Sequence, residues 1–198
     1  MNEKNYDELL NIKTTGNQMG FHSSFHYHRY EATPYEALDS LFEMYELNSK
    51  HRIVDFGCGK GRLNFYIHYF FQAEVVGVEM SENFFQEAIR NRDQYCKRVK
   101  TGKERMHFHF GLAEQYPIEL RDNRFYFFNP FSLAIFMKVI RNILLSYELE
   151  KRELDVILYY PSEDYIYYLE NQTSFELAKE IKLSEKDVSE RFLVYRLT

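Results

Sequence analysis

Glycines and a carboxylate cluster in one short stretch of this 198-residue chain, in an arrangement that can bind a small ligand. Asp55 ends a short apolar run, and glycines follow it at alternate positions: Gly57, Gly59 and Gly61. Glycines between a strand and a helix allow a tight turn and let a ligand approach the backbone closely. A carboxylate before them repels a pyrophosphate and attracts an ammonium group. The stretch therefore favours a ligand with a cationic amino-acid end.

Three neighbouring residues sharpen this prediction. Arg62 stands where the dinucleotide fingerprint G-x-G-x-x-G has its third glycine, which argues against a nicotinamide-dependent oxidoreductase. Glu79 ends the next predicted strand, where a carboxylate can accept hydrogen bonds from both hydroxyls of a ribose. Cys58 lies inside the glycine loop, where a small residue fits, and we expect it to contact the ligand rather than to act as a nucleophile.

Alternating strand and helix patterns after residue 33 predict how these residues are positioned. The predicted strands cover residues 52–56, 74–79, 106–110, 124–128, 154–159, 175–181 and 191–197. Helical patterns between them imply right-handed βαβ units and a mostly parallel sheet covered on both faces, with the last two strands as an antiparallel hairpin at one edge. Ligands of such sheets bind beyond the carboxyl ends of the strands, so the residues that follow each strand are the candidate site.

The residues around the first two strand ends resemble a known family, the class I S-adenosylmethionine-dependent methyltransferases. Residues 53–62, IVDFGCGKGR, are similar to the first motif of that family, and residues 75–81, VVGVEMS, are similar to its second. The resemblance implies an α/β, Rossmann-like three-layer sandwich with about seven strands, and S-adenosyl-L-methionine as the cofactor. It also implies that Asp55 and the glycine loop bind the cofactor, that Glu79 holds its ribose and that Met80 packs on its adenine.

The end of the third predicted strand matches the family less closely. Residues 107–116, HFHFGLAEQY, are similar to the third motif, but Leu112 replaces the common acidic residue. The resemblance then implies that the adenine amino group has another partner, either Glu114 or the backbone of Ala113.

The fourth predicted strand is followed by a partial motif. Residues 125–132, FYFFNPFS, resemble the Asn-Pro-Pro-Tyr/Phe motif of amine- and amide-methylating members, with one proline missing. The resemblance implies Asn129, Pro130 and Phe131 as catalytic residues. The Asn129 amide oxygen and a backbone carbonyl would accept N–H bonds from a substrate nitrogen, and Phe131 would stack on the substrate or contact its cationic centre.

A further likeness lies before the first motif. Residues 30–35, YEATPY, resemble the Tyr-x-x-Thr-Pro segment of some protein lysine methyltransferases, which implies Tyr30 and Thr33 as cofactor-binding residues. An equally favoured interpretation is that Thr33 only caps a helix, with Pro34 at its first position and Glu36 completing a capping box. We expect residues 1–32 to form an arm or lid on a core of residues 33–198, within a single domain.

Histidines in the expected arm could serve chemistry of two kinds. Methyl transfer needs the nucleophile about 3 Å from the methyl carbon, opposite the sulfur, and an amine must also lose a proton. His26, His28 and Tyr30 are candidate helpers for that proton. Together with His22 the two histidines could also suggest zinc, but no cysteine or carboxylate lies at a ligand-like spacing, and we predict no metal site.

Composition limits the remaining functions. The net charge of −5 gives no basis for sequence-independent nucleic-acid binding, and two cysteines are too few for a disulfide scaffold. Without a signal-peptide pattern or a membrane-length apolar run, we expect a cytoplasmic protein. The sequence favours N-methylation of a protein lysine or a small amine over nucleic acid, and leaves the oligomeric state open. The alternative is a non-catalytic sensor or partner subunit that binds S-adenosylmethionine or S-adenosylhomocysteine.

Overall fold

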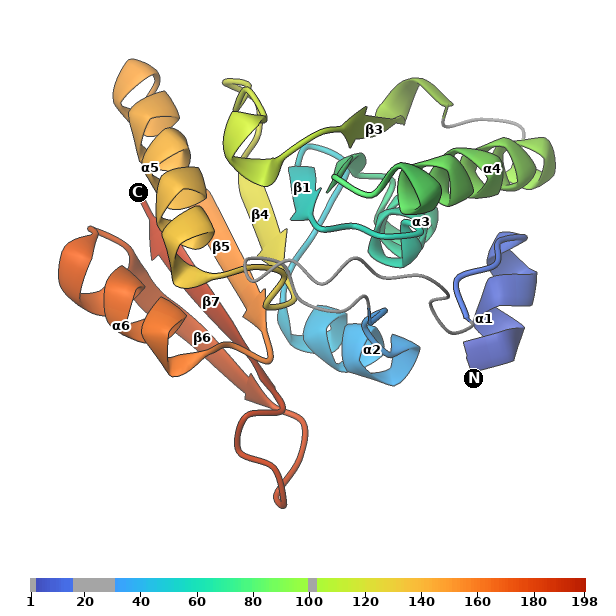
Figure 1. Cartoon of the computed structure of the whole chain (residues 1–198). Helices are drawn as coiled ribbons and strands as arrows, with labels where there is room; N and C mark the ends of the chain where they lie inside the picture. The colour runs from blue at the N-terminus through green and yellow to red at the C-terminus, as the bar shows by residue number, and fades with distance from the viewer. Residues whose placement is uncertain (1–2, 16–30, 100–102) are drawn as a thin grey trace.

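The computed structural model describes residues 3–15, 31–99 and 103–198, which form one seven-stranded sheet with helices on both faces (Figure 1). The strands are β1 (Arg52–Phe56), β2 (Glu74–Glu79), β3 (Met106–Phe110), β4 (Arg124–Phe127), β5 (Leu154–Tyr159), β6 (Glu176–Lys182) and β7 (Arg191–Leu197). Their order across the sheet is β3-β2-β1-β4-β5-β7-β6. The first five strands pair in parallel, and β7 is antiparallel to both of its neighbours.

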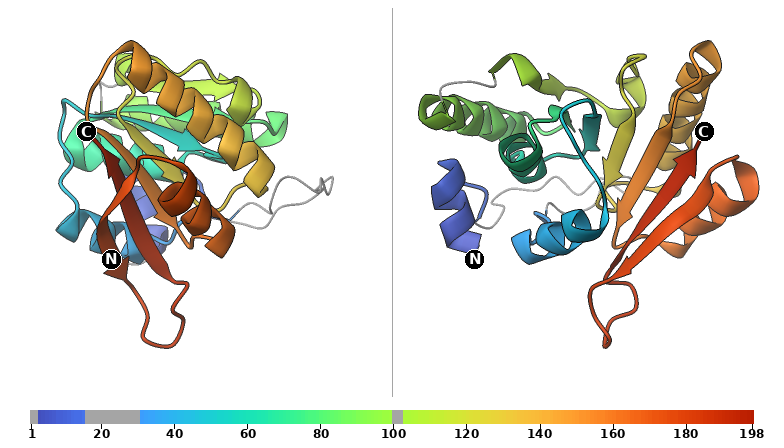
Figure 2. Two further views of the ribbon diagram at one scale, coloured as in Figure 1. Left: turned by 90° about the vertical axis from the view of Figure 1, so that its left-hand side faces the viewer. Right: turned by 180° about the vertical axis from the view of Figure 1, so that it is seen from behind.

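Six α-helices and two short 3₁₀ helices connect and cover these strands in the described part of the chain. The α-helices are α1 (Glu3–Leu10), α2 (Tyr35–Met44), α3 (Arg62–Phe71), α4 (Glu82–Val99), α5 (Leu133–Leu149) and α6 (Glu163–Gln172). The 3₁₀ helices are η1 (Lys103–Arg105) and η2 (Ala113–Gln115). The first four α-helices lie on one side of the sheet and α5 and α6 on the other (Figure 2), so the sheet separates two apolar cores.

The central strands are buried on both faces, which is why their sequences are nearly continuous apolar runs. The edge strand β6 is exposed along most of its length and is correspondingly charged. The strand order reverses between β1 and β4, because the chain leaves β1 towards β2 and β3 and later returns to pair β4 with β1. That reversal is the point at which open α/β sheets bind their ligands.

The predicted fold class is confirmed, including the antiparallel pair at one edge. The predicted bounds of β1, β2, β3, β5 and β7 agree with the structure. Strand β4 ends one residue earlier than predicted, and β6 spans Glu176–Lys182 instead of 175–181. No helix within the described ranges is long and apolar enough to cross a membrane.

The N-terminal helix is attached to the core through buried polar contacts. Both oxygens of the Asp7 carboxylate are used, by the backbone and hydroxyl of Thr14 at 2.8 and 2.7 Å and by the Tyr35 hydroxyl at 2.8 Å. Arg62, at the start of α3, donates to the Thr14 hydroxyl at 2.8 Å and lies over the Tyr35 ring. Helix α1 therefore packs on the core, and the structure describes only residues 3–15 and 31–32 of the expected arm.

Candidate active site

The glycine loop connects β1 to α3 at the reversal point of the sheet. Gly57 and Gly61 have φ angles of 81° and 86°, which a residue with a side chain adopts only at a cost. A Cβ atom on Gly61 would lie 2.9 Å from the Phe65 ring, so the position has no room for a side chain. Both Gly57 and Cys58 donate their backbone N–H groups to the Val78 carbonyl, which ties the loop to the end of β2.

Glu79 joins the loop to β2 from the other side. Its buried carboxylate accepts the backbone N–H of Gly59 at 2.9 Å and that of Ser81 at 2.7 Å. Burial raises the pKa of Glu79, and the backbone N–H groups act in the opposite direction. Glu79 therefore lies at the strand end that the sequence predicted, in contact with the loop.

Asp55 lies one strand away, at the same edge of the sheet, and is 4% exposed. It pairs in register with Gly77 of β2 and Tyr126 of β4. Within the described ranges, its carboxyl group forms no hydrogen bond or ion pair. Burial raises the pKa of Asp55 to about 8, and the nearby carboxylate of Glu79 contributes to the increase. The site therefore holds two buried acids that a cationic ligand would stabilise in their charged form.

Apolar side chains are exposed beside Glu79. Met80, the next residue, is 39% exposed, as a residue that packs on a ligand must be before the ligand binds. Phe110 ends β3 in register with Glu79 and is 51% exposed, with its ring 5.5 Å from that of Phe85. The sequence motifs do not include Phe110, although its place as the last residue of a strand that ends at the site could have indicated it.

The residues after β3 differ in their surroundings. Ala113 opens η2 and is buried in the core below α5. Glu114 is half-buried, and its carbonyl accepts the side-chain N–H of Asn142 from α5 at 2.9 Å. The structure thus places both residues beyond the end of β3, with their backbone held by α5.

The partial motif after β4 packs directly on the glycine loop. Asn129 is half-buried and has a left-handed backbone, with φ of 38°. A Cβ atom on Gly57 would lie 2.9 Å from the Cβ of Pro130, so the two turns are in close contact. Phe131 is 1% exposed, its ring packs edge-on against Phe127, and its carbonyl accepts the Tyr165 hydroxyl. The expectation that Phe131 stacks on a substrate is therefore wrong, because its ring belongs to the core.

Thr33 is buried between α2 and the sheet. Its hydroxyl shares a 2.8 Å hydrogen bond with the Tyr126 hydroxyl, and its carbonyl accepts from Arg62 at 3.2 Å. The predicted capping box with Glu36 is wrong, because Pro34 occupies the cap position of α2 and the Tyr35 N–H is bonded by the Glu3 carboxylate at 2.8 Å. Thr33 is held instead above β4, where Tyr126 pairs in register with Asp55.

The remaining predicted residues fall outside the described part of the chain. These are Tyr30 and the histidines of the expected arm, His22, His26 and His28. Among the described residues, no group of three His, Cys, Asp or Glu side chains could hold a metal ion.

The sequence around this site is similar to that of a known protein family. Residues 47–148, more than half of the chain, match the protein family described as a methyltransferase domain. The chain belongs to this methyltransferase family. The match covers both sides of the site, from five residues before β1 to the last turn of α5. Among curated proteins, no sequence matches this methyltransferase.

Solved structures share the fold of this methyltransferase. An RNA methyltransferase from Salinibacter ruber, in complex with S-adenosyl-L-homocysteine, is 17% identical with a TM-score of 0.60, over 85% of this chain and 93% of that one. An rRNA methylase from Streptococcus thermophilus is 16% identical with a TM-score of 0.55, over 81% and 93%. A geranyl diphosphate C-methyltransferase from Streptomyces coelicolor A3(2) is 12% identical with a TM-score of 0.54, over 82% and 77%. Methyltransferases with this fold therefore act on methyl acceptors of different chemistry.

The enzyme is an S-adenosylmethionine-dependent methyltransferase, and its site fits this cofactor. The cofactor carries an ammonium and a sulfonium group, and Asp55 has no cationic partner among the described residues to stabilise its charge. The glycine loop offers backbone that a ligand can approach, and Met80 and Phe110 offer exposed apolar surface beside Glu79. The carboxylate therefore matches the positive charges of the cofactor, and the exposed apolar side chains match its base.

Proposed function

We propose that this methyltransferase transfers its methyl group to nitrogen, in a protein lysine or a small amine. The observation that carries the proposal is the contact between the Asn129-Pro130 turn and the glycine loop at Gly57. We infer that this contact brings the Asn129 amide and the backbone carbonyls of the turn next to the loop that is assigned to the cofactor. These groups accept N–H bonds, which is what positioning a substrate nitrogen requires.

The cofactor is assigned to residues of this chain as follows. Asp55 binds the ammonium group, Glu79 accepts hydrogen bonds from the ribose hydroxyls, and Met80 packs on the adenine. The cofactor approaches the backbone of the loop closely, at residues Gly57, Cys58, Gly59 and Gly61. Ala113 and Glu114, beyond β3, are assigned to the adenine amino group, and Tyr30 and Thr33 to the methionine end. The bound cofactor supplies an already activated methyl group, so the protein contributes alignment and exclusion of water.

Asn129 is the residue assigned to the acceptor. Its amide oxygen and a carbonyl of the turn accept N–H bonds from the substrate nitrogen and orient the lone pair towards the methyl carbon. Pro130 contributes by holding the turn against Gly57, and Phe131 by anchoring it in the core. Phe131 is therefore a positioning residue in this proposal.

The decisive experiment compares Asn129→Ala with a matched variant, Asn171→Ala, whose side chain bonds the Tyr167 carbonyl on the exposed face of α6. Radiolabelled methyl transfer into lysate, followed by hydrolysis and amino-acid analysis, identifies N-methylated products. We expect Asn129→Ala to lower turnover strongly with nearly unchanged cofactor affinity, and Asn171→Ala to leave both unchanged. Normal turnover in Asn129→Ala would remove Asn129 from the mechanism.

Two other results would replace this proposal. Labelled methyl recovered in RNA would make the enzyme an RNA methyltransferase, as two of the structural relatives are named. The net charge of −5 argues against that acceptor. Cofactor binding without transfer to any acceptor would favour the sensor or partner subunit.

A further inference from the structure

Aromatic side chains gather beside Asn129, at the edge of the sheet where β4 and β5 end. We name Phe128, Tyr159, Tyr160 and Phe192 the aromatic cluster. The Tyr159 ring lies 4.5 Å from that of Phe128, 4.6 Å from that of Phe192 and 6.1 Å from that of Tyr160. The loop between β6 and β7 extends from the same edge (Figure 1). The cluster therefore lies beside Asn129, the residue assigned to the methyl acceptor.

The hydroxyl group of Tyr159 distinguishes this cluster from ordinary core packing. Tyr159 is 2% exposed, yet its hydroxyl forms no hydrogen bond with any residue in the described ranges. The Tyr159 hydroxyl oxygen keeps contact with solvent, whereas the hydroxyl of Tyr126, on the next strand, is bonded to Thr33. The Tyr159 hydroxyl therefore marks a place for a polar group that comes from outside the described residues.

Carboxylates from two segments act on the tyrosines of the cluster. Burial raises the pKa of Tyr159, and the next largest causes are the carboxylates of Glu190 and Glu31. The Tyr160 hydroxyl donates to Asp187, and this bond is the largest cause that raises the pKa of Tyr160. Asp187 and Glu190 belong to the loop between β6 and β7, and Glu31 precedes α2. Two separate segments therefore place negative charge around the same rings.

The cluster is also within electrostatic reach of the cofactor site. Burial raises the pKa of Tyr126 well above its usual value, and both Asp55 and Tyr159 contribute to the increase. Tyr126 pairs in register with Asp55, and its ring lies 6.5 Å from that of Phe192 in the cluster. Strand β4 therefore connects the acid assigned to the cofactor with the aromatic cluster.

We propose that Phe128 and Tyr160, the half-buried rings of the aromatic cluster, bind the methyl acceptor as an organic cation, an alkylammonium group, together with the Tyr159 hydroxyl and the three carboxylates. Aromatic faces attract cations, the carboxylates add to that attraction, and the same carboxylates repel a phosphate backbone. The Tyr159 hydroxyl accepts one N–H of the ammonium group. The inference rests on the proposed function and names its substrate class.

The transfer step balances without a further reactant. The bound ammonium group loses one proton to water, and its lone pair attacks the methyl carbon. The carbon–sulfur bond breaks as the carbon–nitrogen bond forms, and S-adenosylhomocysteine leaves with the electron pair on sulfur.

A quaternary cation tests recognition without any transfer. Choline cannot accept a further methyl group, and 3,3-dimethylbutan-1-ol has the same shape without the charge. Both are titrated by calorimetry into the full chain saturated with S-adenosylhomocysteine. We expect choline to bind about tenfold more tightly than the neutral alcohol, because the aromatic faces and the carboxylates act only on charge. Equal affinity for the two probes would overturn the inference.

Two conservative variants test the assigned residues. Asp187→Asn keeps an oxygen for the Ser189 N–H, offers an amide N–H to the Tyr160 hydroxyl oxygen and removes the charge, and we expect choline affinity to fall about fivefold. Its matched control is Glu185→Gln, an equal charge change at an exposed position in the same loop, which we expect to have no effect. Equal effects of the two variants would overturn the role of Asp187.

Tyr159→Phe keeps the ring and removes the hydroxyl. We expect it to weaken n-butylammonium, which has N–H groups, and to leave choline, which has none, unchanged. Equal loss for both cations would overturn the role of the hydroxyl.

Competition with choline identifies the source of the cation. A lysine-containing peptide that displaces choline at lower concentration than n-butylamine indicates a protein, and the reverse order indicates a small amine. A single-stranded oligoribonucleotide that displaces choline better than either would overturn the inference. Nitrogen methylation without choline binding would contradict only this inference. Choline binding with transfer only to carbon or oxygen would contradict only the proposed function.

Discussion

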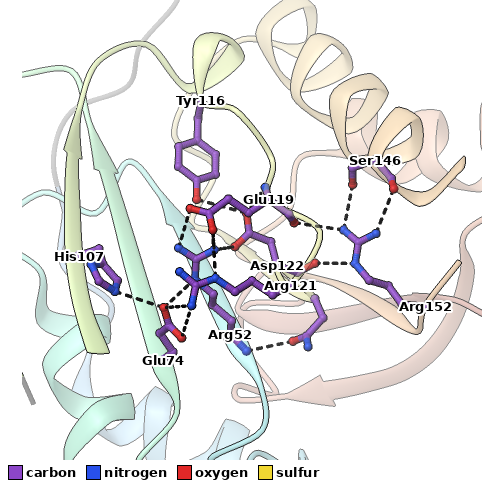
Figure 3. A network of polar contacts seen from close by, with 10 residues as sticks. Arg52, Glu74, His107, Tyr116, Glu119, Arg121, Asp122, Ser146 and Arg152 are labelled. Carbon is purple, nitrogen blue, oxygen red and sulfur yellow. Dashed lines mark hydrogen bonds and ion pairs between the residues drawn. The ribbon is translucent and has the colours of Figure 1, made fainter. Parts of the chain in front are cut away.

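At the amino-terminal edge of the parallel strands, the buried carboxylates Asp122 and Asp155 each face an arginine. Arg52 lies 2.6 Å from Asp122 and also contacts Glu74 and Glu119 (Figure 3). Asp155 accepts two hydrogen bonds from Arg196, both at 2.8 Å. At the carboxyl-terminal edge, Asp55 is buried almost as deeply and has no cation beside it among the described residues.

The difference appears in the protonation of these acids. Burial raises the pKa of Asp122 to about 6, although Arg52 lowers it in part. Burial raises the pKa of Asp55 to about 8, and the carboxylate of Glu79 adds to the increase where Arg52 opposes it for Asp122. At the amino-terminal edge, arginines of the protein compensate the buried carboxylates. At the carboxyl-terminal edge, the compensating positive charge has to come from a ligand. The first edge should therefore govern stability and the second edge should govern binding.

The largest effect is expected at the amino-terminal edge. Arg52→Met leaves Asp122 and its neighbours without their buried cation, which should lower the free energy of unfolding by about 3–5 kcal/mol. Urea unfolding measures it. Arg121→Met is the control, because Arg121 belongs to the same network but its side chain is 58% exposed. Weaker S-adenosylhomocysteine binding in folded Arg52→Met would contradict the assignment of stability to one edge and binding to the other.

Asp55→Asn reverses this pattern at the carboxyl-terminal edge. Loss of the charged acceptor should weaken S-adenosylhomocysteine binding by about 1.5–3 kcal/mol, measured by calorimetric titration. Thermal unfolding of the ligand-free variant should show no loss of stability, because the carboxyl group has no internal partner to lose. Asp155→Asn is the opposite control, with lower stability and unchanged affinity. Undiminished affinity in Asp55→Asn would refute the assignment of Asp55 to the cofactor.

The pH dependence follows from the raised pKa of Asp55. A carboxyl group whose pKa rises from 3.8 to about 8 on folding binds its proton more tightly in the folded state. Its contribution to stability is complete below pH 3.8 and is lost as the pH rises through 8. Ligand-free stability should therefore fall over this range, by at most about 1.4 kcal/mol per pH unit.

Cofactor binding should respond to pH in the opposite direction, because the ammonium group favours the charged carboxylate. Binding of S-adenosylhomocysteine at pH 7 should release a proton, measured by calorimetry in two buffers with different ionisation enthalpies. Asp55→Asn should abolish the release. Equal release in this variant would assign the proton to another group.

The smallest effect is expected for Glu79→Gln. Gly59 and Ser81 bond different oxygens of the Glu79 carboxylate, and glutamine keeps an acceptor oxygen for only one of them. The charge beside the ribose and one hydrogen bond to the loop are lost, and affinity should fall by about 1 kcal/mol. Glu82→Gln, an exposed change in the first turn of α4, should have no effect on affinity. Unchanged affinity in Glu79→Gln would remove Glu79 from the cofactor site.

Much of the fold could be predicted because strand and helix patterns are local. Apolar runs mark the central strands, and the glycines after β1 mark a turn that no other residue fits. Helix capping failed as a prediction because Thr33 bonds Tyr126, 93 positions along the chain, in place of its own helix. The prediction that Phe131 stacks on a substrate failed for the same kind of reason. Its place in the motif matched a stacking residue, but its ring packs against Phe127 in the core.

The sequence by itself determined the order of strands and helices, the turn at Gly57–Gly61 and the strand ends where Asp55, Glu79 and Asn129 lie. Those features follow from neighbouring residues and from the period of the pattern. Only the tertiary structure decided which acid has a cation beside it and which aromatic ring is exposed. Burial and pairing depend on segments that meet across the whole chain, and the charge of each acid depends on both.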